Sequence, residues 1–257
     1  MKIILTGYSS PQNRMGAFDR YADGSIIKPV KIGDLLRMPR DRLMEQDEYG
    51  EGMGEEAFRE REGGLAVVAI GASVGGPAAL ERVLSRLPSR LSAALVVSQH
   101  MPNGFTKPLA ERLAAISGLR VREAQDGDAL QSGNAFIAPG GYNMEIARGG
   151  RIHLQKAMRT PSPSIDLMMK SVADAYGPRC VGVLMSGMLT DGVFGMKAVK
   201  DRGGVTIAQD ESSSVVFGMN KAAIEAGAVD LVAHVSIIAD RIVNIVSEFS
   251  VGKNTVK

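Results

Sequence analysis

The sequence predicts an α/β fold: a doubly wound, mostly parallel sheet with an antiparallel hairpin at its edge, preceded by a small N-terminal fragment. Continuous apolar runs alternate with segments of helical periodicity, and such runs are buried on both faces of a parallel sheet. Thirty glycines against 11 prolines supply the tight turns that join short strands and helices. A chain of 257 residues, 45% of them hydrophobic, can bury one sizeable core and carry a small appendage.

Residues 1–44 have the pattern of half a domain. Strands are expected over 3–10 and 25–30, with helices over 13–22 and 31–43, and such a unit needs further elements before its sheet can close. Residues 45–63 are expected to form a linker. Between Glu45 and Glu62 there are eight acidic and two basic residues, a local charge of −6, with little apolar periodicity.

Residues 64–250 contain the repeated strand and helix patterns of the predicted sheet. Strands are expected over 65–72, 94–99 and 180–186, and helices over 77–87, 107–117 and 193–203. Between 124 and 156, the segments NAFIAPG, YNMEIAR and RIHLQKA alternate apolar and polar residues around glycine-rich turns, which predicts an antiparallel excursion at the sheet edge. The apolar segments 206–210 and 222–235 complete the series.

Charge and cysteine content exclude several classes of protein. Thirty basic and 28 acidic residues give a net charge of +2 without a basic cluster, so neither a nucleic-acid nor a membrane partner is expected. The single cysteine, Cys180, lies in an apolar run, which predicts a buried thiol in a reducing compartment. No apolar run reaches the roughly 18 residues of a membrane helix, and the N-terminus lacks a cleavage-type site. We therefore expect a soluble, cytoplasmic protein.

A glycine-rich turn supplies a candidate nucleophile. The segment GASVGG, residues 71–76, stands between an apolar strand and a helix that opens with Pro77, the context that a G-x-S-x-G motif requires. A sharp turn there would expose the Ser73 hydroxyl. The same turn could instead cradle a phosphate or only reverse the chain. The segment lacks a P-loop pattern and a full G-x-G-x-x-G, which weakens the nucleotide-binding alternative.

Three histidines are candidates for a general base. His100 directly follows a core strand, whereas His153 lies within an alternating segment and His234 lies near the C-terminal segment. A hydrogen-bonded turn histidine is the commoner case for one histidine taken alone. Because the carboxyl ends of parallel strands share one sheet edge, however, His100 is expected to lie beside Ser73, which favours a base.

Asp191 completes a possible triad. It follows the strand expected over 180–186, and its carboxylate could accept the ring N–H of His100 and stabilise the imidazolium. The alternative is a helix N-cap, which is a common role for such an aspartate. Three strand ends thus bring a serine, a histidine and an aspartate to one edge. Their order along the chain differs from that of the α/β hydrolases, in which the acid precedes the histidine.

Residues 65–246 resemble the catalytic domain of the chemotaxis protein-glutamate methylesterases, the CheB family. The resemblance rests on the ordered blocks AIGASVGGP, VVSQHMPNGFT, ERL, AFIAPGGYNMEI, PSPSIDLMMKSVA, VGVLMSGMLTDGVFGM, TIAQDESSSVVFGM and AAIEAGAVD. It implies that Ser73 is the nucleophile, His100 the base and Asp191 the acid, with no metal and no cofactor. The backbone N–H of Met188 would help to hold the oxyanion, and Val74 and Gly187 would belong to the same active-site loops.

The sequence departs from the family pattern at two places. Val74 stands where a threonine usually follows the nucleophile, and Leu189-Thr190 stand where the acid loop usually has Gly-Asn. If the threonine contributes a side-chain hydrogen bond, its loss would slow turnover or change substrate preference. A backbone donor at the same position would remain.

Residues 1–44 resemble the last part of a response-regulator receiver domain, from its fourth strand onward. Thr6 matches the switch hydroxyl position, and Lys28-Pro29 match the family's Lys-Pro pair. The phosphoacceptor aspartate of such a domain would lie upstream of this segment. We therefore expect that the chain is not activated by phosphorylation of its own aspartate.

The resemblance implies a serine carboxylic-ester hydrolase that demethylates glutamyl methyl esters on chemoreceptors and deamidates selected receptor glutamines. Its partner would be the cytoplasmic helical bundle of a methyl-accepting chemoreceptor, with a chemotaxis kinase or receiver-type proteins as further candidates. One alternative is a weakly active or inactive scaffold that binds receptor or signalling partners, which the departures at Val74 and Leu189-Thr190 and the incomplete receiver favour and the complete triad opposes. Another is a nucleotide-binding module that uses residues 71–76.

Overall fold

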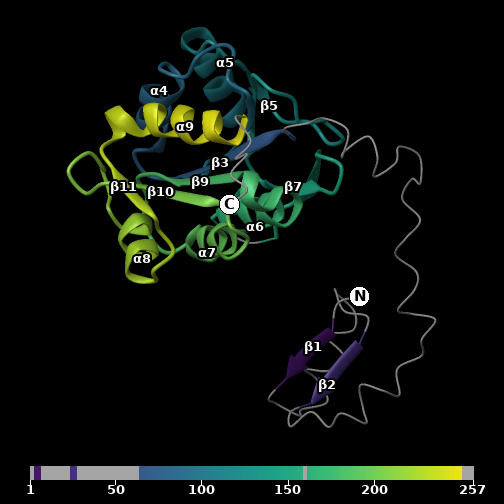
Figure 1. Ribbon diagram of the computed structural model, residues 1–257. Helices are drawn as coiled ribbons and strands as arrows, with labels where there is room; N and C mark the ends of the chain where they lie inside the picture. Colours follow the sequence, from purple (N-terminus) through teal and green to yellow (C-terminus); the bar gives the residue numbers. More distant parts are fainter. Residues whose placement is uncertain (1–2, 7–23, 28–63, 159–160, 251–257) are drawn as a thin grey trace, which may run out of the picture. The chain divides into compact units, whose positions relative to one another are not determined.

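The computed structural model describes residues 3–6, 24–27, 64–158 and 161–250, which fall into two units (Figure 1). In the first unit, β1 (Ile3–Thr6) and β2 (Gly24–Ile27) pair in parallel; β1 lies within the strand expected over 3–10, and β2 overlaps the one expected over 25–30 but begins one residue before it. The helices expected over 13–22 and 31–43, the Lys28-Pro29 pair and the linker over 45–63 lie outside the described residues. The boundaries at 44 and 63 therefore stay predictions.

The second unit is built on a seven-stranded sheet in which all neighbours are parallel. Its order is β11-β10-β9-β3-β4-β6-β5. The strands are β3 (Ala66–Ala72), β4 (Ala93–Gln99), β5 (Arg120–Glu123), β6 (Asn134–Ile137), β9 (Cys180–Leu184), β10 (Val205–Gln209) and β11 (Leu231–Ala233). Every residue of β3, β4 and β9 is buried, as their continuous apolar runs predict.

Helices cover both faces of this sheet (Figure 1). One layer contains α4 (Gly76–Leu84), α5 (Thr106–Ile116) and α9 (Val235–Ser250), and the other contains α6 (Ile165–Tyr176), α7 (Val193–Asp201) and α8 (Met219–Glu225). A short 3₁₀ turn, η2 (Gly177–Arg179), precedes β9. Along β3, Val68 and Ile70 pack into the first layer, whereas Val67 and Ala69 pack into the second. The predicted doubly wound α/β fold is thus confirmed.

The antiparallel hairpin differs in detail from the expectation. Strands β7 (Tyr142–Ala147) and β8 (Arg151–Lys156) form a separate two-stranded sheet, with Met144 and Ile152 buried in the core beneath α6. Residues 134–137, expected in the same excursion, instead form β6 and pair in parallel with β4 and β5. The reason is burial: three of the four β6 residues are buried, whereas the buried residues of β7 and β8, Met144, Ile146 and Ile152, each lie between half-buried or exposed neighbours.

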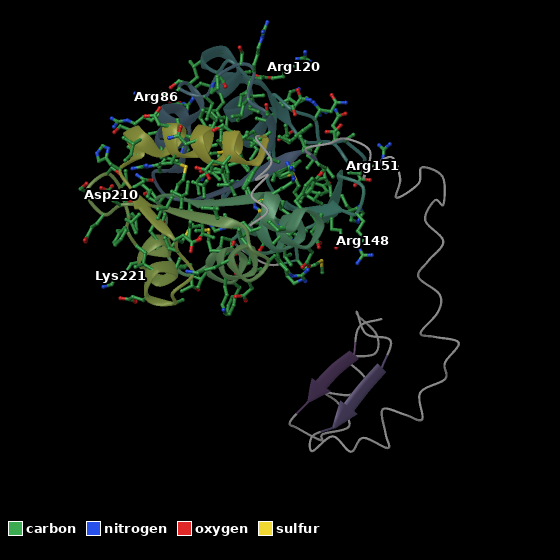
Figure 2. All side chains as sticks on the ribbon, viewed as in Figure 1. Arg86, Arg120, Arg148, Arg151, Asp210 and Lys221 are labelled. Atoms are coloured by element: carbon green, nitrogen blue, oxygen red, sulfur yellow. The ribbon has the colours of Figure 1, made fainter. Side chains whose placement is uncertain are left out.

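Charged side chains lie on the outside of the second unit, as Figure 2 shows for Arg86, Arg120, Arg148, Arg151, Asp210 and Lys221. Cys180 is buried, as predicted, and burial raises the pKa of its thiol well above the usual range. Of the helices that the structure describes, none is long and apolar enough to cross a membrane. Within the same residues, no group of three or more His, Cys, Asp or Glu side chains could hold a metal ion.

Candidate active site

Ser73 lies at the turn between β3 and α4. Its backbone N–H donates to the Ser186 carbonyl at 3.0 Å, and its own carbonyl accepts the N–H of Gly76 at 2.9 Å. Gly75 has a φ of 81°, and a Cβ there would lie 2.6 Å from the Cβ of Val215. Only glycine combines this left-handed backbone with so close a neighbour. Ser73 itself is 8% exposed, so a small part of it reaches the surface at the turn.

His100 follows the last residue of β4, which is the direct neighbour of β3 in the sheet. Its ring Nδ1 lies 3.1 Å from Ser73 Oγ, and its Nε2 lies 2.8 Å from Asp191 Oδ2. The other two histidines are exposed and bonded elsewhere. His153 pairs with Asp126, and His234 hydrogen-bonds Ser236. The structure therefore brings the serine, histidine and aspartate selected from the sequence into one hydrogen-bonded series.

Asp191 lies in the loop between β9 and α7, with its carboxylate at the N-terminus of α6. The Oδ2 atom accepts the backbone N–H of Ile165 at 2.8 Å, and Oδ1 accepts that of Asp166 at 3.0 Å. Burial opposes ionisation of this carboxyl, but hydrogen bonds from His100 and from the two backbone N–H groups outweigh it and lower its pKa. The alternative role considered from the sequence is a helix cap. Asp191 is also a cap, but of α6 rather than of α7, the helix that it precedes.

The two loops beside Ser73 contain the residues expected near an oxyanion. Val74 and Met188 are 44% and 50% exposed, and in the described part of the chain neither backbone N–H donates a hydrogen bond to the protein. The N–H of Gly187, in contrast, donates to the Val216 carbonyl at 3.0 Å. A Cβ at Gly187 would lie 2.8 Å from the Cβ of Ser73, so the absence of a side chain lets the two loops approach.

Leu189 has an unusual backbone conformation. Its φ is 69°, the left-handed region that glycine adopts readily, and its side chain is 62% exposed. This is one of the positions where the sequence departs from the family pattern, which has glycine there. A side chain in this conformation costs roughly 1–2 kcal/mol. The loop thus keeps a glycine-like path although glycine is absent.

Sequence reasoning missed two buried polar residues that hold the site together. Gln99 donates from Nε2 to the carbonyl oxygens of Ser73 and His100, at 2.9 and 3.0 Å. Ser186 donates from Oγ to the Val74 carbonyl at 2.7 Å and accepts the N–H of Val216 at 3.0 Å. A signal was present for both, because each is a polar residue at the end of an otherwise apolar strand run.

A cleft of about 400 Å³ opens beside Ser73 and His100. Its walls are mostly apolar and are formed by Val74, Pro77, Met101, Pro102 and Phe105, together with Gly75 and Gln99. An apolar cleft of this kind suits an uncharged group such as an ester better than a free carboxylate.

Comparisons with known proteins agree on the family. Residues 68–242 match the family model described as CheB methylesterase. A protein-glutamate methylesterase/protein-glutamine glutaminase from Moorella thermoacetica is 49% identical over 193 residues, which are 73% of this chain and 46% of that protein. A protein of the same name from Desulfitobacterium hafniense is 37% identical over 246 residues, which are 91% of this chain and 63% of that protein.

A solved structure supports the same assignment. The crystal structure of the Thermotoga maritima CheB methylesterase catalytic domain matches with a TM-score of 0.68 and 38% identity, and the match covers 70% of this chain and 98% of that one. The chain spans about half the length of the first curated relatives it matches, 46% and 52% for two of them. The family model, the sequence identity and the fold together show that the chain belongs to the CheB methylesterase family.

Proposed function

We propose that this chain is a protein-glutamate methylesterase that hydrolyses glutamyl methyl esters on chemoreceptors, with Ser73 as nucleophile, His100 as general base and Asp191 as acid. One observation carries the proposal: Ser73 Oγ, the His100 ring and the Asp191 carboxylate form a continuous series with separations of 3.1 and 2.8 Å. A hydroxyl, an imidazole and a carboxylate in that order are the groups that acyl transfer needs.

The arrangement defines the direction of proton transfer. Because the Asp191 carboxylate accepts the proton on Nε2, the unprotonated Nδ1 of His100 faces Ser73. Ser73 Oγ attacks the ester carbonyl and gives its proton to Nδ1, and Asp191 stabilises the imidazolium. The C–O bond to methanol then breaks as Nδ1 returns the proton to the leaving oxygen. Water, activated by the same nitrogen, hydrolyses the acyl-enzyme to glutamate and free Ser73.

The oxyanion that forms during attack needs hydrogen-bond donors. We assign this role to the backbone N–H groups of Val74 and Met188, which flank Ser73 and donate to no acceptor among the described residues. Loss of one such donor costs about 3 kcal/mol of transition-state stabilisation. A backbone donor is independent of the side chain, so valine in place of threonine leaves it in place.

The same residues account for a second reaction on the same partner. The relatives' names pair methylesterase with protein-glutamine glutaminase, and attack on a glutamine amide differs chiefly in its leaving group. The partner that we propose for both reactions is the cytoplasmic helical bundle of a methyl-accepting chemoreceptor.

The two alternatives gain less support. The continuous hydrogen-bonded series favours an enzyme over an inactive scaffold. For a nucleotide-binding turn, backbone N–H groups of residues 71–76 would have to point to the phosphate. The N–H groups of Ser73 and Gly76 instead donate to carbonyl oxygens within the protein, which leaves fewer donors for a phosphate, and the N–H of Val74 is assigned above to the oxyanion.

Methanol release from methylated chemoreceptor tests the proposal. Ser73→Ala should reduce release to the background rate, because no other hydroxyl lies against His100 Nδ1 among the described residues. The exposed Ser132→Ala, which removes the same hydroxyl outside the site, should retain the wild-type rate. Unchanged release by Ser73→Ala, with the wild-type unfolding midpoint, would contradict the assignment.

A further inference from the structure

Asp166 and Asp191 each accept hydrogen bonds from the N-terminus of the helix that the other residue adjoins. Asp166 belongs to the first turn of α6, but its Oδ1 accepts the backbone N–H groups of Gly192 and Gly195, at 2.9 and 2.7 Å, at the start of α7. Asp191 directly precedes Gly192, yet its carboxylate caps α6 by accepting the N–H of Ile165 and of Asp166. Each carboxylate therefore satisfies backbone donors at the start of the helix that the other residue adjoins.

This arrangement depends on close packing of α6 against α7, which lie side by side in Figure 1. A Cβ at Gly195 would lie 2.7 Å from the Cβ of Met169 and 3.2 Å from the Cα of Asp166. A larger residue at 195 would therefore separate the two helices. The glycine allows the first turn of α7 to come within hydrogen-bond distance of the Asp166 carboxylate.

The pair of carboxylates is electrostatically unfavourable in isolation. Burial and the negative charge of Asp191 raise the pKa of Asp166, the hydrogen bonds from Gly195 and Gly192 oppose the rise, and the net result is a pKa of about 6. The positive ends of the two helices offset part of the repulsion. Two carboxylates kept so close despite this cost are characteristic of a functional site, where geometry takes precedence over stability.

We propose that Asp166 is a positioning residue for the catalytic acid. By accepting the N–H groups of Gly192 and Gly195, it anchors the turn that carries Asp191 and keeps Asp191 Oδ2 at 2.8 Å from His100 Nε2. Asp166 has no hydrogen bond to Ser73 or His100 in the described structure, so it acts through Asp191 alone. The proposal rests on the proposed function for the role of Asp191 in the reaction.

Three variants test this role. Asp166→Ala removes the acceptor, whereas Asp166→Asn keeps an oxygen at the Oδ1 position. Asp174→Ala is the matched control, because Asp174 also lies on α6 and pairs with Arg202 just after α7, at the end of the helices remote from the site. For each variant, kcat and KM of methanol release are measured together with the downfield ¹H NMR signal of the proton shared by His100 and Asp191.

Asp166→Ala should lower kcat by about tenfold to a hundredfold with little change in KM, because small misplacements of catalytic groups have effects of this size. It should also weaken or shift the downfield proton signal. Asp166→Asn should restore both kcat and the signal to near their wild-type values, and Asp174→Ala should leave both unchanged. Asp166→Ser, whose side chain is too short to span to α7, serves as the deletion if Asp166→Ala does not fold.

Two results would overturn the positioning role. One is a deletion variant with wild-type kcat and a wild-type proton signal, and the other is an Asp166→Asn variant as impaired as the deletion. Failure of the proposed function is distinguishable from both. In that case the wild-type chain releases no methanol, whereas the proton signal still reports whether Asp166 positions Asp191.

Discussion

Gln99 donates a hydrogen bond from its side-chain Nε2 to the carbonyl oxygen of Ser73, at 2.9 Å. Gln99 is the last residue of β4, Ser73 directly follows the neighbouring strand β3, and the same nitrogen also donates to the carbonyl of His100. One buried amide therefore links the turn of the nucleophile to the turn of the base. The Oε1 atom of Gln99 has no hydrogen-bond partner among the described residues, and it lies 2.0 Å from where a Cβ of Gly76 would be.

Replacing Gln99 with leucine should impair both stability and activity. The change removes the donor for two carbonyl oxygens and should lower the free energy of unfolding by about 1–3 kcal/mol. It should also lower kcat, because the turns carrying Ser73 and His100 lose their common contact. Urea unfolding and methanol release measure the two effects. Gln155→Leu, at an exposed position of β8, should change neither, and equal behaviour of the two variants would refute the linking role.

Asp191→Asn should abolish most activity while leaving the fold intact. The asparagine can still accept backbone N–H groups of α6, but its amide does not stabilise an imidazolium and favours the wrong tautomer of His100. We expect kcat to fall by about 10³ to 10⁴, as for a triad acid in serine proteases. Asp126→Asn is the matched control, since Asp126 pairs with the exposed His153 outside the site. A fall in kcat of less than about tenfold would argue against Asp191 as the acid.

Leu189→Gly should stabilise the protein. Glycine relieves the left-handed backbone conformation at φ 69°, and the larger conformational freedom of glycine in the unfolded chain offsets only part of this gain. The expected increase in the free energy of unfolding is about 1 kcal/mol. Urea unfolding provides the measurement. The control is Leu231→Gly, because Leu231 is partly exposed on β11 and has an ordinary φ; this substitution should lower the free energy of unfolding. A lower free energy of unfolding for Leu189→Gly would show that the backbone at 189 is not strained.

The pH dependence of stability should change when Asp166 is replaced by asparagine. Its pKa rises on folding from 3.8 to about 6, so the folded protein binds a proton more tightly than the unfolded chain does. The stability from this group is therefore fully present below pH 3.8 and is lost as the pH rises through about 6. Asparagine does not titrate, so Asp166→Asn should reduce the decline in unfolding free energy between pH 4 and pH 7, relative to wild type. An identical decline in unfolding free energy in both proteins would show that Asp166 does not cause this pH dependence.

Much of the fold follows from local patterns. The runs at 65–72, 94–99 and 180–186 are apolar except for polar residues at the ends of the last two, and a strand buried on both faces requires that composition. Because parallel strands end at one edge, the positions of Ser73 and His100 directly after two such runs, and of Asp191 in the loop after the third, are enough to predict that they meet. The hairpin was also visible, although the partners of residues 134–137 were not, since alternation does not specify which strand lies alongside.

The contacts around Asp191 could not be read in the same way. The segment of α6 is recognisable in the sequence only as a block of family resemblance, and without its position no partner for the Asp191 carboxylate other than His100 can be named. The N–H of Asp166 and the Asp191 carboxylate are 25 positions apart, and they meet only because α6 packs closely on α7. Which ring nitrogen of His100 faces Ser73 also depends on side-chain rotation, which leaves no trace in the sequence.

The three strands that carry the candidate triad, β4, β3 and β9, are adjacent at the centre of the sheet and buried along their full length. Backbone amides in such strands exchange with solvent only when the whole domain opens. Partial openings at the edges, such as fraying of β5 or β11, would leave Ser73, His100 and Asp191 in their hydrogen-bonded arrangement. The hydrolysis that we propose should thus persist until the entire core unfolds cooperatively.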